Sequence, residues 1–563
     1  MKFRDLPYER PDKDVLLSEL KSLVERFRSA ESAAEQAEIF DEYNTLTKHV
    51  STLATIASIR HTIDTRDSFY DAENEFFDET SPLLEELEQE FGRAMLASEF
   101  RPQLEEKYGS LLFKNLEISA RSFKPEMIEL MQQENRLMSR YQKLYASAVV
   151  EFDGRTIPLP MLGPYKESTD RSVRRRAYEV EGSFFDSHRD ELDELYDELI
   201  KNRTAQAKML GYDNYIQLGY DRLGRNCYGP EKVAAFRRQI AEDIVPIVSR
   251  EKEKQRQRLG VDKLKYYDDN LLLRCGNAKP EGSAEDILAA GLEMYHSLSP
   301  ETASFIDVMY ENELLDVLSR DGKAPGGYCT ELLDYNSCFI FSNFNATSDD
   351  VDVLTHEAGH AFAGFRAMEH GYIPQLIAPT YEACECHSMS MEFLTAPYHH
   401  LFFGKNVKKY EYAHAASGLI FIPYGCMVDE FQYIAYERPE LTPDERNEIW
   451  LGLEKKYRPW IDHDGLPFYS RGAGWQRQLH IYLDPFYYID YCMAQAVAFC
   501  FWLSSMENRE ETWRKYLDFA DKGGAETFEQ LVLGAGFELP YTSGCMKAIG
   551  ERVAGWLDAN EAD

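Results

Sequence analysis

The sequence is poor in positive charge and in long apolar runs. Its 563 residues carry 62 lysines and arginines against 97 aspartates and glutamates, a formal net charge of −35 at pH 7. Nucleic-acid binding needs a basic surface, so this balance argues against a nucleic-acid partner and weakly favours cationic peptides. The late apolar run at 492–503 is far too short to span a bilayer. The first ten residues are charged where a signal peptide is apolar, so we expect a cytoplasmic protein with no membrane partner.

Several chemistries lack their sequence motifs. The 10 cysteines form no paired C-x-x-C arrangement, which indicates reduced and mostly buried thiols. A Walker A sequence and a G-x-S-x-G elbow are both absent, so phosphate binding and a serine nucleophile have no support. The glycine-rich segment from Gly472 to Trp475 lacks the third glycine of a dinucleotide fingerprint, and a flexible substrate loop is the better interpretation.

Helical patterning dominates the chain. Residues 12–105 alternate charged and apolar positions at helical spacing with few glycines or prolines, which predicts a bundle of long helices. Asp153 and Gly154 stand between two strand-like runs within 147–159 and predict a β-hairpin. We therefore expect a mainly α-helical protein.

The segment His356-Glu357-Ala358-Gly359-His360 is an H-E-x-x-H motif. Residues four apart lie one above the other on a helix, so both imidazoles can point at one ion. Glu357 is rotated from His356 by about 100° around the helix, which lets it reach a metal-bound water without displacing a ligand. The spacing predicts a site for one Zn²⁺ per chain, with Glu357 as the general base.

The residues around this motif favour a helix. Thr347 or Ser348 is the expected N-cap, and Thr347 with Asp350 fits the spacing of a capping box. Residues 338–344 are aromatic and β-branched and predict a strand beside the metal helix, which could hold an extended peptide by main-chain hydrogen bonds. Apolar residues at spacings of three and four should face the core, namely Val351, Leu354, Ala358 and Ala361.

A catalytic zinc normally takes three protein ligands and keeps one open position, so a third ligand is needed. Glu385 is the best candidate, because it lies in a helix predicted over 381–394 and shares one face with Ser388 and Glu392. Three neighbours are rival ligands by type: Cys384, Cys386 and His387. They rank lower, because His387 falls on roughly the opposite face and thiolates suit closed structural sites better.

The H-E-x-x-H motif together with the segment at 385–392 resembles the thimet oligopeptidase and oligoendopeptidase F family of zinc peptidases. The short oligoendopeptidase F-like, or Pz-peptidase-like, branch is the most similar. The resemblance covers roughly residues 140–555. It implies that the zinc ligands are His356, His360 and Glu385 and that the base is Glu357.

The same resemblance implies a large helical zincin-like metallopeptidase, with a small β element beside the metal helix and a central substrate channel. We expect an N-terminal helical part at 1–140, a catalytic region at 141–555 with its metal core at about 325–500, and an acidic tail at 556–563. In this family the narrow channel excludes folded proteins, so short unstructured peptides are the expected substrates.

A second block near the C-terminus also resembles this family. Residues 472–475 are similar to its glycine-rich loop, and residues 480–491 are similar to its His/Tyr segment. In the family these side chains reach over the zinc to the substrate carbonyl, which implies donors at His480, Tyr488 and Tyr491. Imidazole and phenol donors aimed at an oxyanion stabilise the tetrahedral state. The segment is one residue longer than the thimet-type pattern, so Tyr482 and Tyr487 compete, and core packing is the alternative for any single tyrosine.

Together these residues predict a zinc-dependent endopeptidase that hydrolyses short oligopeptides. Glu357 would take a proton from a zinc-activated water and pass it to the leaving amine, while His480 and the tyrosines hold the oxyanion. A zinc aminopeptidase is one alternative, but it should carry G-x-M-E-N before the motif, and the nearest string, at 505–508, lacks the glycine and follows it. The second alternative is a helical peptide-binding protein whose site is catalytically inactive. A chelator-sensitive peptidase assay would distinguish it from an enzyme.

Overall fold

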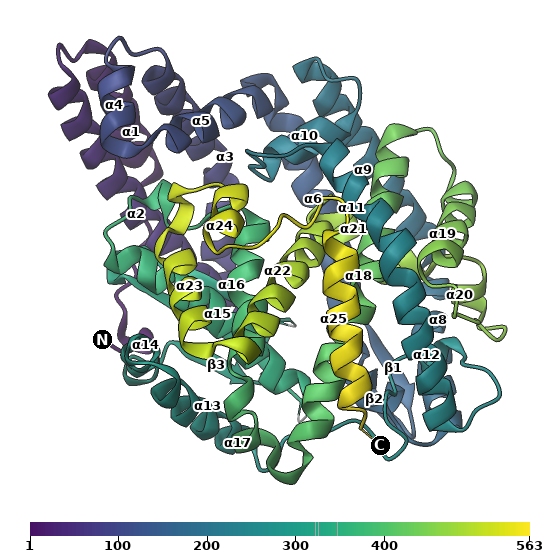
Figure 1. Ribbon diagram of the computed structural model, residues 1–563. Helices are drawn as coiled ribbons and strands as arrows, with labels where there is room; N and C mark the ends of the chain where they lie inside the picture. The colour runs from purple at the N-terminus through teal and green to yellow at the C-terminus, as the bar shows by residue number, and fades with distance from the viewer. Residues whose placement is uncertain (321, 325, 346, 563) are drawn as a thin grey trace.

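The computed structural model describes residues 1–320, 322–324, 326–345 and 347–562, apart from the side chains of residues 139, 143 and 146. Helices form most of the chain and the sheets are small, so the predicted mainly α-helical class is confirmed (Figure 1). No helix within the described ranges is long and apolar enough to cross a lipid bilayer. In the predicted acidic tail, residues 556–559 continue the last helix, and Asp563 lies outside the described residues.

The N-terminal helices have a core of their own. Asp12 and Ser32 cap the first two, because their side-chain oxygens accept backbone N–H groups of the first turn. Phe27 and Phe91 meet in the centre of this core, with ring centroids 4.9 Å apart. The bundle predicted over 12–105 is therefore present (purple to blue in Figure 1). These helices are α1 Lys13–Ser29, α2 Ala33–Ile63, α3 Ser68–Leu96, α4 Arg101–Tyr108 and α5 Ser110–Ser122. Helix α6 (Ile128–Ala146) follows and packs against α9 (Arg189–Leu210).

The predicted hairpin follows. Strands β1 (Val149–Phe152) and β2 (Arg155–Pro158) pair antiparallel, and the turn residues Asp153 and Gly154 have φ angles of 49° and 75°. Positive φ at both turn positions is the geometry that Asp-Gly favours, which is why the sequence predicts this turn. The next helices are α7 Gly163–Lys166, α8 Arg171–Ser187, α9 Arg189–Leu210, α10 Tyr215–Arg222, α11 Pro230–Gln239, α12 Val245–Leu259, α13 Ala284–Leu298 and α14 Pro300–Glu311.

A small sheet lies beside helix α15 (Asp349–Glu369), which carries the H-E-x-x-H motif. Its strand order is β3 (Leu315–Leu318), β5 (Ser337–Phe344) and β4 (Tyr328–Leu332). The strand predicted at 338–344 is therefore confirmed as β5, but the expectation that it holds a peptide is wrong. Both edges of β5 are paired, parallel to β3 and antiparallel to β4, so β4 is the edge strand next to α15.

Four of the remaining helices, α18, α23, α24 and α25, pack against α16 or α22, whereas α19 contacts α18, α20 contacts α8 and α21 contacts α6. The apolar run at 492–503 forms the middle of α22, which contacts α16, α18, α23 and α25. A helix surrounded in this way is apolar on all sides, so the run is core rather than membrane span. These helices are α16 Tyr381–Leu394, α17 His400–Phe403, α18 Val407–Glu437, α19 Pro443–Tyr457, α20 Pro467–Ser470, α21 Leu479–Leu483, α22 Tyr488–Glu507, α23 Arg509–Asp521, α24 Phe528–Gly534 and α25 Cys545–Ala559.

Candidate metal centre and active site

Helix α15 begins where the sequence predicts, but not with a capping box. Ser348 is the N-cap, and its side chain makes no capping hydrogen bond. The Thr347 hydroxyl donates to Asn345 Oδ1, and the Asp350 carboxylate accepts the backbone N–H of Asn345. Both side chains therefore fix the loop before the helix. The predicted apolar stripe is confirmed, each residue being at most 1% exposed: Val351, Leu354, Ala358 and Ala361.

Gly359 lets the two helices that carry the candidate ligands approach closely. Helix α16, which coincides with the helix predicted over 381–394, packs against α15. A Cβ on Gly359 would lie 2.6 Å from the Cα of Ser388 and 2.9 Å from the carbonyl oxygen of His387. Both are backbone atoms, which no side-chain rotation can move. The glycine of the motif therefore sets how near the histidines come to Glu385.

Replacing Gly359 with alanine should lower both thermal stability and metal content. Overpacking of this kind typically costs about 1–3 kcal/mol, and here it pushes the ligand-bearing helices apart. Gly452 in α19 is the matched control, because a Cβ there meets no atom within 4 Å. Gly452→Ala should keep or raise Tm, since alanine favours helix. A Gly359→Ala protein with unchanged Tm and metal content would contradict this packing role.

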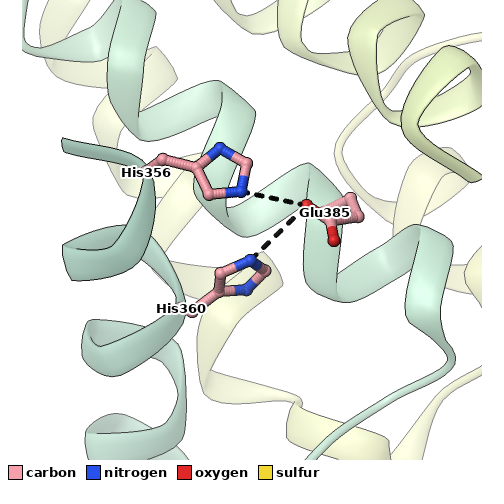
Figure 2. Close-up of side chains that lie close together, drawn as sticks. All are labelled: His356, His360 and Glu385. Carbon is pink, nitrogen blue, oxygen red and sulfur yellow. Dashed lines mark ion pairs between the residues drawn. The ribbon is translucent and has the colours of Figure 1, made fainter. Parts of the chain in front are cut away.

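Three candidate ligands converge where α15 meets α16 (Figure 2). His356 and His360 project from successive turns of α15 toward Glu385 on α16. Their Nε2 atoms lie 3.2 Å and 3.4 Å from Glu385 Oε2. Tetrahedral ligands at about 2.0–2.1 Å from one zinc are roughly 3.3 Å apart, so this spacing fits a single ion. In the part of the chain that the structure describes, no other set of three such ligands gathers as closely.

The rival ligands point elsewhere. His387 packs against Phe519 with ring centroids 5.3 Å apart, and burial lowers its pKa to about 3. The Cys384 thiol lies 3.6 Å from the carbonyl oxygen of Pro379, and Cys386 is fully buried. None of the three joins the group of converging ligand atoms.

Glu392 holds the outer nitrogen of His356. Its Oε1 lies 2.7 Å from His356 Nδ1, and its Oε2 lies 2.8 Å from Nε2 of His414 on α18. A carboxylate on the outer nitrogen of a metal-binding histidine fixes the ring's tautomer and orientation. Glu392 shares the predicted face of α16 with Glu385, seven residues away. No sequence pattern marks His414, which only the tertiary fold brings to this point.

Glu385 is held from two further sides. Ser388 donates to its Oε2 at 3.0 Å, and the Tyr487 hydroxyl donates to its Oε1 at 2.5 Å. Burial raises the pKa of Glu385, but the imidazoles of His360 and His356 lower it by more, so the net pKa lies well below the usual value. The carboxylate is therefore ionised, as a metal ligand must be.

Glu357 lies on α15, between the two histidines, and is 9% exposed. Burial raises its pKa, and the imidazoles of His356 and His360 lower it in part, with a net shift upward. A carboxylate with a raised pKa accepts a proton more readily than an exposed glutamate does.

His480 and three tyrosines form one aromatic cluster. The ring centroid of His480 lies 5.0 Å from that of Tyr488, 5.7 Å from that of Tyr487 and 5.8 Å from that of Tyr491. The Tyr487 bond to Glu385 joins this cluster to the three candidate ligands. The structure thus brings together the predicted donors His480, Tyr488 and Tyr491, and adds Tyr487, one of the two competing tyrosines.

Tyr482, the other competing tyrosine, lies in the core. Its ring stacks on Tyr141 at 4.0 Å with an interplanar angle of 8°, and its hydroxyl donates to the Leu192 carbonyl at 3.2 Å. For Tyr482 the core-packing alternative is therefore correct.

Two family models cover most of the chain. Residues 3–123 match the Peptidase M3 N-terminal domain, and residues 164–551 match Peptidase family M3. The chain belongs to peptidase family M3. The resemblance stated from the sequence is thereby confirmed, and with it the class of metallopeptidase, whose chemistry requires a catalytic metal.

Relatives of this M3 peptidase include solved structures. PZ peptidase A, solved with an inhibitor, is 46% identical, with a TM-score of 0.97 and 99% of each chain covered. A candidate oligoendopeptidase F from Bacillus anthracis strain Ames is 41% identical, with a TM-score of 0.91, over 99% of this chain and 98% of its own. The oligoendopeptidase F homologue of Lactococcus lactis subsp. lactis strain IL1403 is 24% identical over 59% of this chain and 57% of its own length. The chain therefore spans less than two thirds of that curated relative.

The glycine-rich segment of the M3 peptidase is packed, so the expectation of a flexible loop is wrong. Gly472 has a φ of 83°, and a Cβ there would lie 2.2 Å from the carbonyl oxygen of Asn447. Trp475 is fully buried, and its Nε1 donates to Asn447 Oδ1 at 2.9 Å. Glycine serves here for its backbone angle and for a close approach.

Two cavities adjoin the segment that carries His480. One, of about 340 Å³, is lined by the start of α15 and by α18, with Phe421, Tyr424 and Arg477 in its wall. The other, of about 1310 Å³, is lined by residues of α3 and α6 and by Leu483 and Asp484. The chain from Arg477 to Asp484 therefore touches the larger cavity at one end and the smaller at the other.

Proposed function

We propose that this M3 peptidase is a zinc-dependent endopeptidase that hydrolyses short, unstructured oligopeptides. The observation that carries the proposal is the convergence of His356, His360 and Glu385, with Glu357 and a cluster of phenol and imidazole donors beside them. The family supports the metal, and the names of the relatives, oligoendopeptidase F and PZ peptidase, support an oligopeptide substrate.

In this mechanism His356, His360 and Glu385 hold one Zn²⁺. When bound, the zinc polarises the scissile carbonyl and lowers the pKa of a water. Glu357 accepts the proton of the attacking water and delivers it to the leaving amine, a role that its raised pKa favours. Tyr488, Tyr491 and His480 donate hydrogen bonds to the carbonyl oxygen as negative charge develops on it.

His480 is well suited to donate from its Nε2. The Gln478 side-chain amide lies 3.0 Å from His480 Nδ1, and the oxygen of that amide accepts the Tyr424 hydroxyl at 2.9 Å. With its oxygen engaged, Gln478 presents an N–H to Nδ1, so the ring proton resides on Nε2. Burial lowers the pKa of His480, which favours the neutral imidazole.

The assay that tests this function uses internally quenched peptides with acetylated N-termini. Cleavage in the interior of the peptide, loss of activity with a zinc chelator and recovery with added Zn²⁺ are the expected results. Cleavage only of peptides with a free N-terminus would indicate the aminopeptidase instead. Peptide binding by the zinc-loaded protein without any cleavage would indicate a dead site.

Tyr491→Phe should lower kcat about 10²–10³-fold with little change in KM, the expected loss for a principal oxyanion donor. The change removes one hydroxyl and preserves the ring packing. Tyr482→Phe is the control, because its hydroxyl bonds the Leu192 carbonyl in the core. It should leave kcat within about threefold of the wild type. Normal kcat in both Tyr491→Phe and Tyr488→Phe, with zinc bound, would remove the tyrosines from the mechanism.

Tyr487→Phe should weaken zinc binding, because it removes the hydrogen bond to Glu385 Oε1. Losing an outer partner of a metal ligand typically costs about 10–100-fold in metal affinity. Zinc dissociation constants from competition with a chromophoric chelator measure the effect. An unchanged dissociation constant with a large fall in kcat would instead make Tyr487 an oxyanion donor.

The cytoplasmic location remains a prediction from the sequence, as does the absence of a nucleic-acid partner. Cell fractionation followed by immunodetection tests the location. Recovery of the protein with the membrane or in the culture medium would contradict it.

A further inference from the structure

The smaller cavity contains an arginine for which the described residues provide no direct ion pair. Arg477 lines its wall beside Tyr424. Its Nε is buried without a hydrogen-bond partner, and its Nη2 reaches only the Tyr266 hydroxyl, at a long 3.4 Å. Within the described residues no carboxylate forms an ion pair with it. Arg477 is half-buried, and a guanidinium N–H that is buried without a partner is costly, so its position needs a reason.

The other cations of this cavity are paired. Lys252 Nζ lies 2.6 Å from Asp269 Oδ1, and Arg458 Nη2 lies 2.7 Å from Asp269 Oδ2. Arg458 also approaches Glu454 at 3.4 Å. The Arg458 guanidinium lies over the Tyr424 ring, 5.4 Å from its centroid. Its charge and that of Lys252 are matched by Asp269 and Glu454, so among the described lining residues Arg477 is the arginine without an ion pair.

The carboxylates near Arg477 have other partners. Glu181, the carboxylate that acts most strongly on it, pairs with Lys166 at 2.5 Å and accepts the Tyr469 hydroxyl. Three acids also line the cavity, on the side of α7 and α15: Glu167, Asp349 and Asp352. Burial raises the pKa of Glu167 and of Asp352 to about 7, so these carry less negative charge near neutral pH than exposed acids do.

The arginine is close to the catalytic cluster. It stands three residues before His480, so the two Cα atoms are at most about 11 Å apart, the length of about three extended peptide residues. Gln478 joins the two regions, because it bonds both Tyr424 in the cavity wall and His480. Phe421 in the same wall lies 5.7 Å from Tyr488 between ring centroids. Arg477 therefore lies within the length of a few residues of a peptide held at His480.

We propose that Arg477 binds a carboxylate of the peptide substrate about three residues from the scissile bond. A guanidinium offers two parallel N–H groups that match a carboxylate, and burial strengthens the pair. The peptide's own C-terminus is one source of this carboxylate, and an Asp or Glu side chain is the other. Arg477 is thus a specificity-determining residue that selects acidic or short C-terminal segments. The inference rests on the proposed peptidase function and deepens it.

The experiment compares three versions of one acetylated peptide, each with three residues after the scissile bond. The first ends in a free carboxylate and the second in a carboxamide. The third is a carboxamide with Glu in place of Gln at the last position. We measure kcat/KM for each with the zinc-loaded wild type and with Arg477→Gln and Arg477→Lys. Binding of the same peptides to the Glu357→Gln protein gives a second readout, independent of turnover.

For the wild type, kcat/KM should be about tenfold or more higher for the free acid, the Glu peptide or both than for the plain carboxamide, mainly because KM is lower. In Arg477→Gln the ratio of kcat/KM between each carboxylate peptide and the plain carboxamide should fall close to one. In Arg477→Lys, which keeps the positive charge, the ratio should fall only in part. The preferred peptide identifies the source of the carboxylate. Equal kcat/KM for all three peptides in wild type would overturn the inference, even if Arg477→Gln fails to fold. An equal loss for all three in Arg477→Gln would make the arginine merely structural. No cleavage of any of the peptides would contradict the proposed function itself.

Discussion

Replacing Glu357 with glutamine should lower kcat by a factor of about 10² or more while zinc stays bound. The amide has the shape of the carboxylate but cannot accept the proton of the attacking water. Glu357 is absent from the group of converging ligand atoms, which consists of His356, His360 and Glu385, so the metal should remain. The expected signature is a loss in turnover at full zinc occupancy.

The neighbouring carboxylates provide the comparison for this variant. Glu392 bonds His356 Nδ1 and should affect metal binding first, so Glu392→Gln should lose zinc affinity by about 10–100-fold. Turnover measured at saturating zinc separates the two roles. A Glu357→Gln enzyme with near-normal kcat would exclude this residue as the base.

Replacing Glu385 with alanine should leave the protein nearly without zinc. The change removes one of the three proposed ligands and leaves the Tyr487 hydroxyl without its acceptor. A structural or catalytic zinc needs its full ligand set, and two histidines alone bind it weakly. Elemental analysis after dialysis measures the loss, and activity should fall with it.

Cys386→Ala is the matched control on the same helix. Its thiol is fully buried and lies outside the group of converging ligands, so zinc content should be unchanged. Full zinc occupancy in Glu385→Ala, or loss of zinc in Cys386→Ala, would mean that the third ligand is wrongly chosen.

Local patterns predict the elements that carry the candidate ligands. The i, i+4 histidines, the apolar stripe from Val351 to Ala361 and the uninterrupted helix at 381–394 all depend on residues a few positions apart. The Asp153-Gly154 turn is equally local, because its backbone angles follow from the two residues themselves. These predictions are confirmed.

What the patterns miss depends on contacts between distant segments. His414 reaches Glu392 from another helix, and the choice between Tyr482 and Tyr487 depends on which ring faces Glu385 and which faces Tyr141. The glycine-rich segment reads as a loop, yet Trp475 anchors it in the core. Strand alternation likewise cannot tell that β5 is central and β4 the edge, because pairing order is set by the whole fold.

X-ray absorption at the zinc edge tests the central claim most directly. The measurement is made on the full chain with one equivalent of zinc added. If His356, His360 and Glu385 hold the ion, the first shell should contain only nitrogen and oxygen at about 2.0–2.1 Å, with imidazole scattering beyond it. Sulfur at about 2.3 Å would place Cys384 or Cys386 in the site and contradict the account. So would a first shell without imidazole.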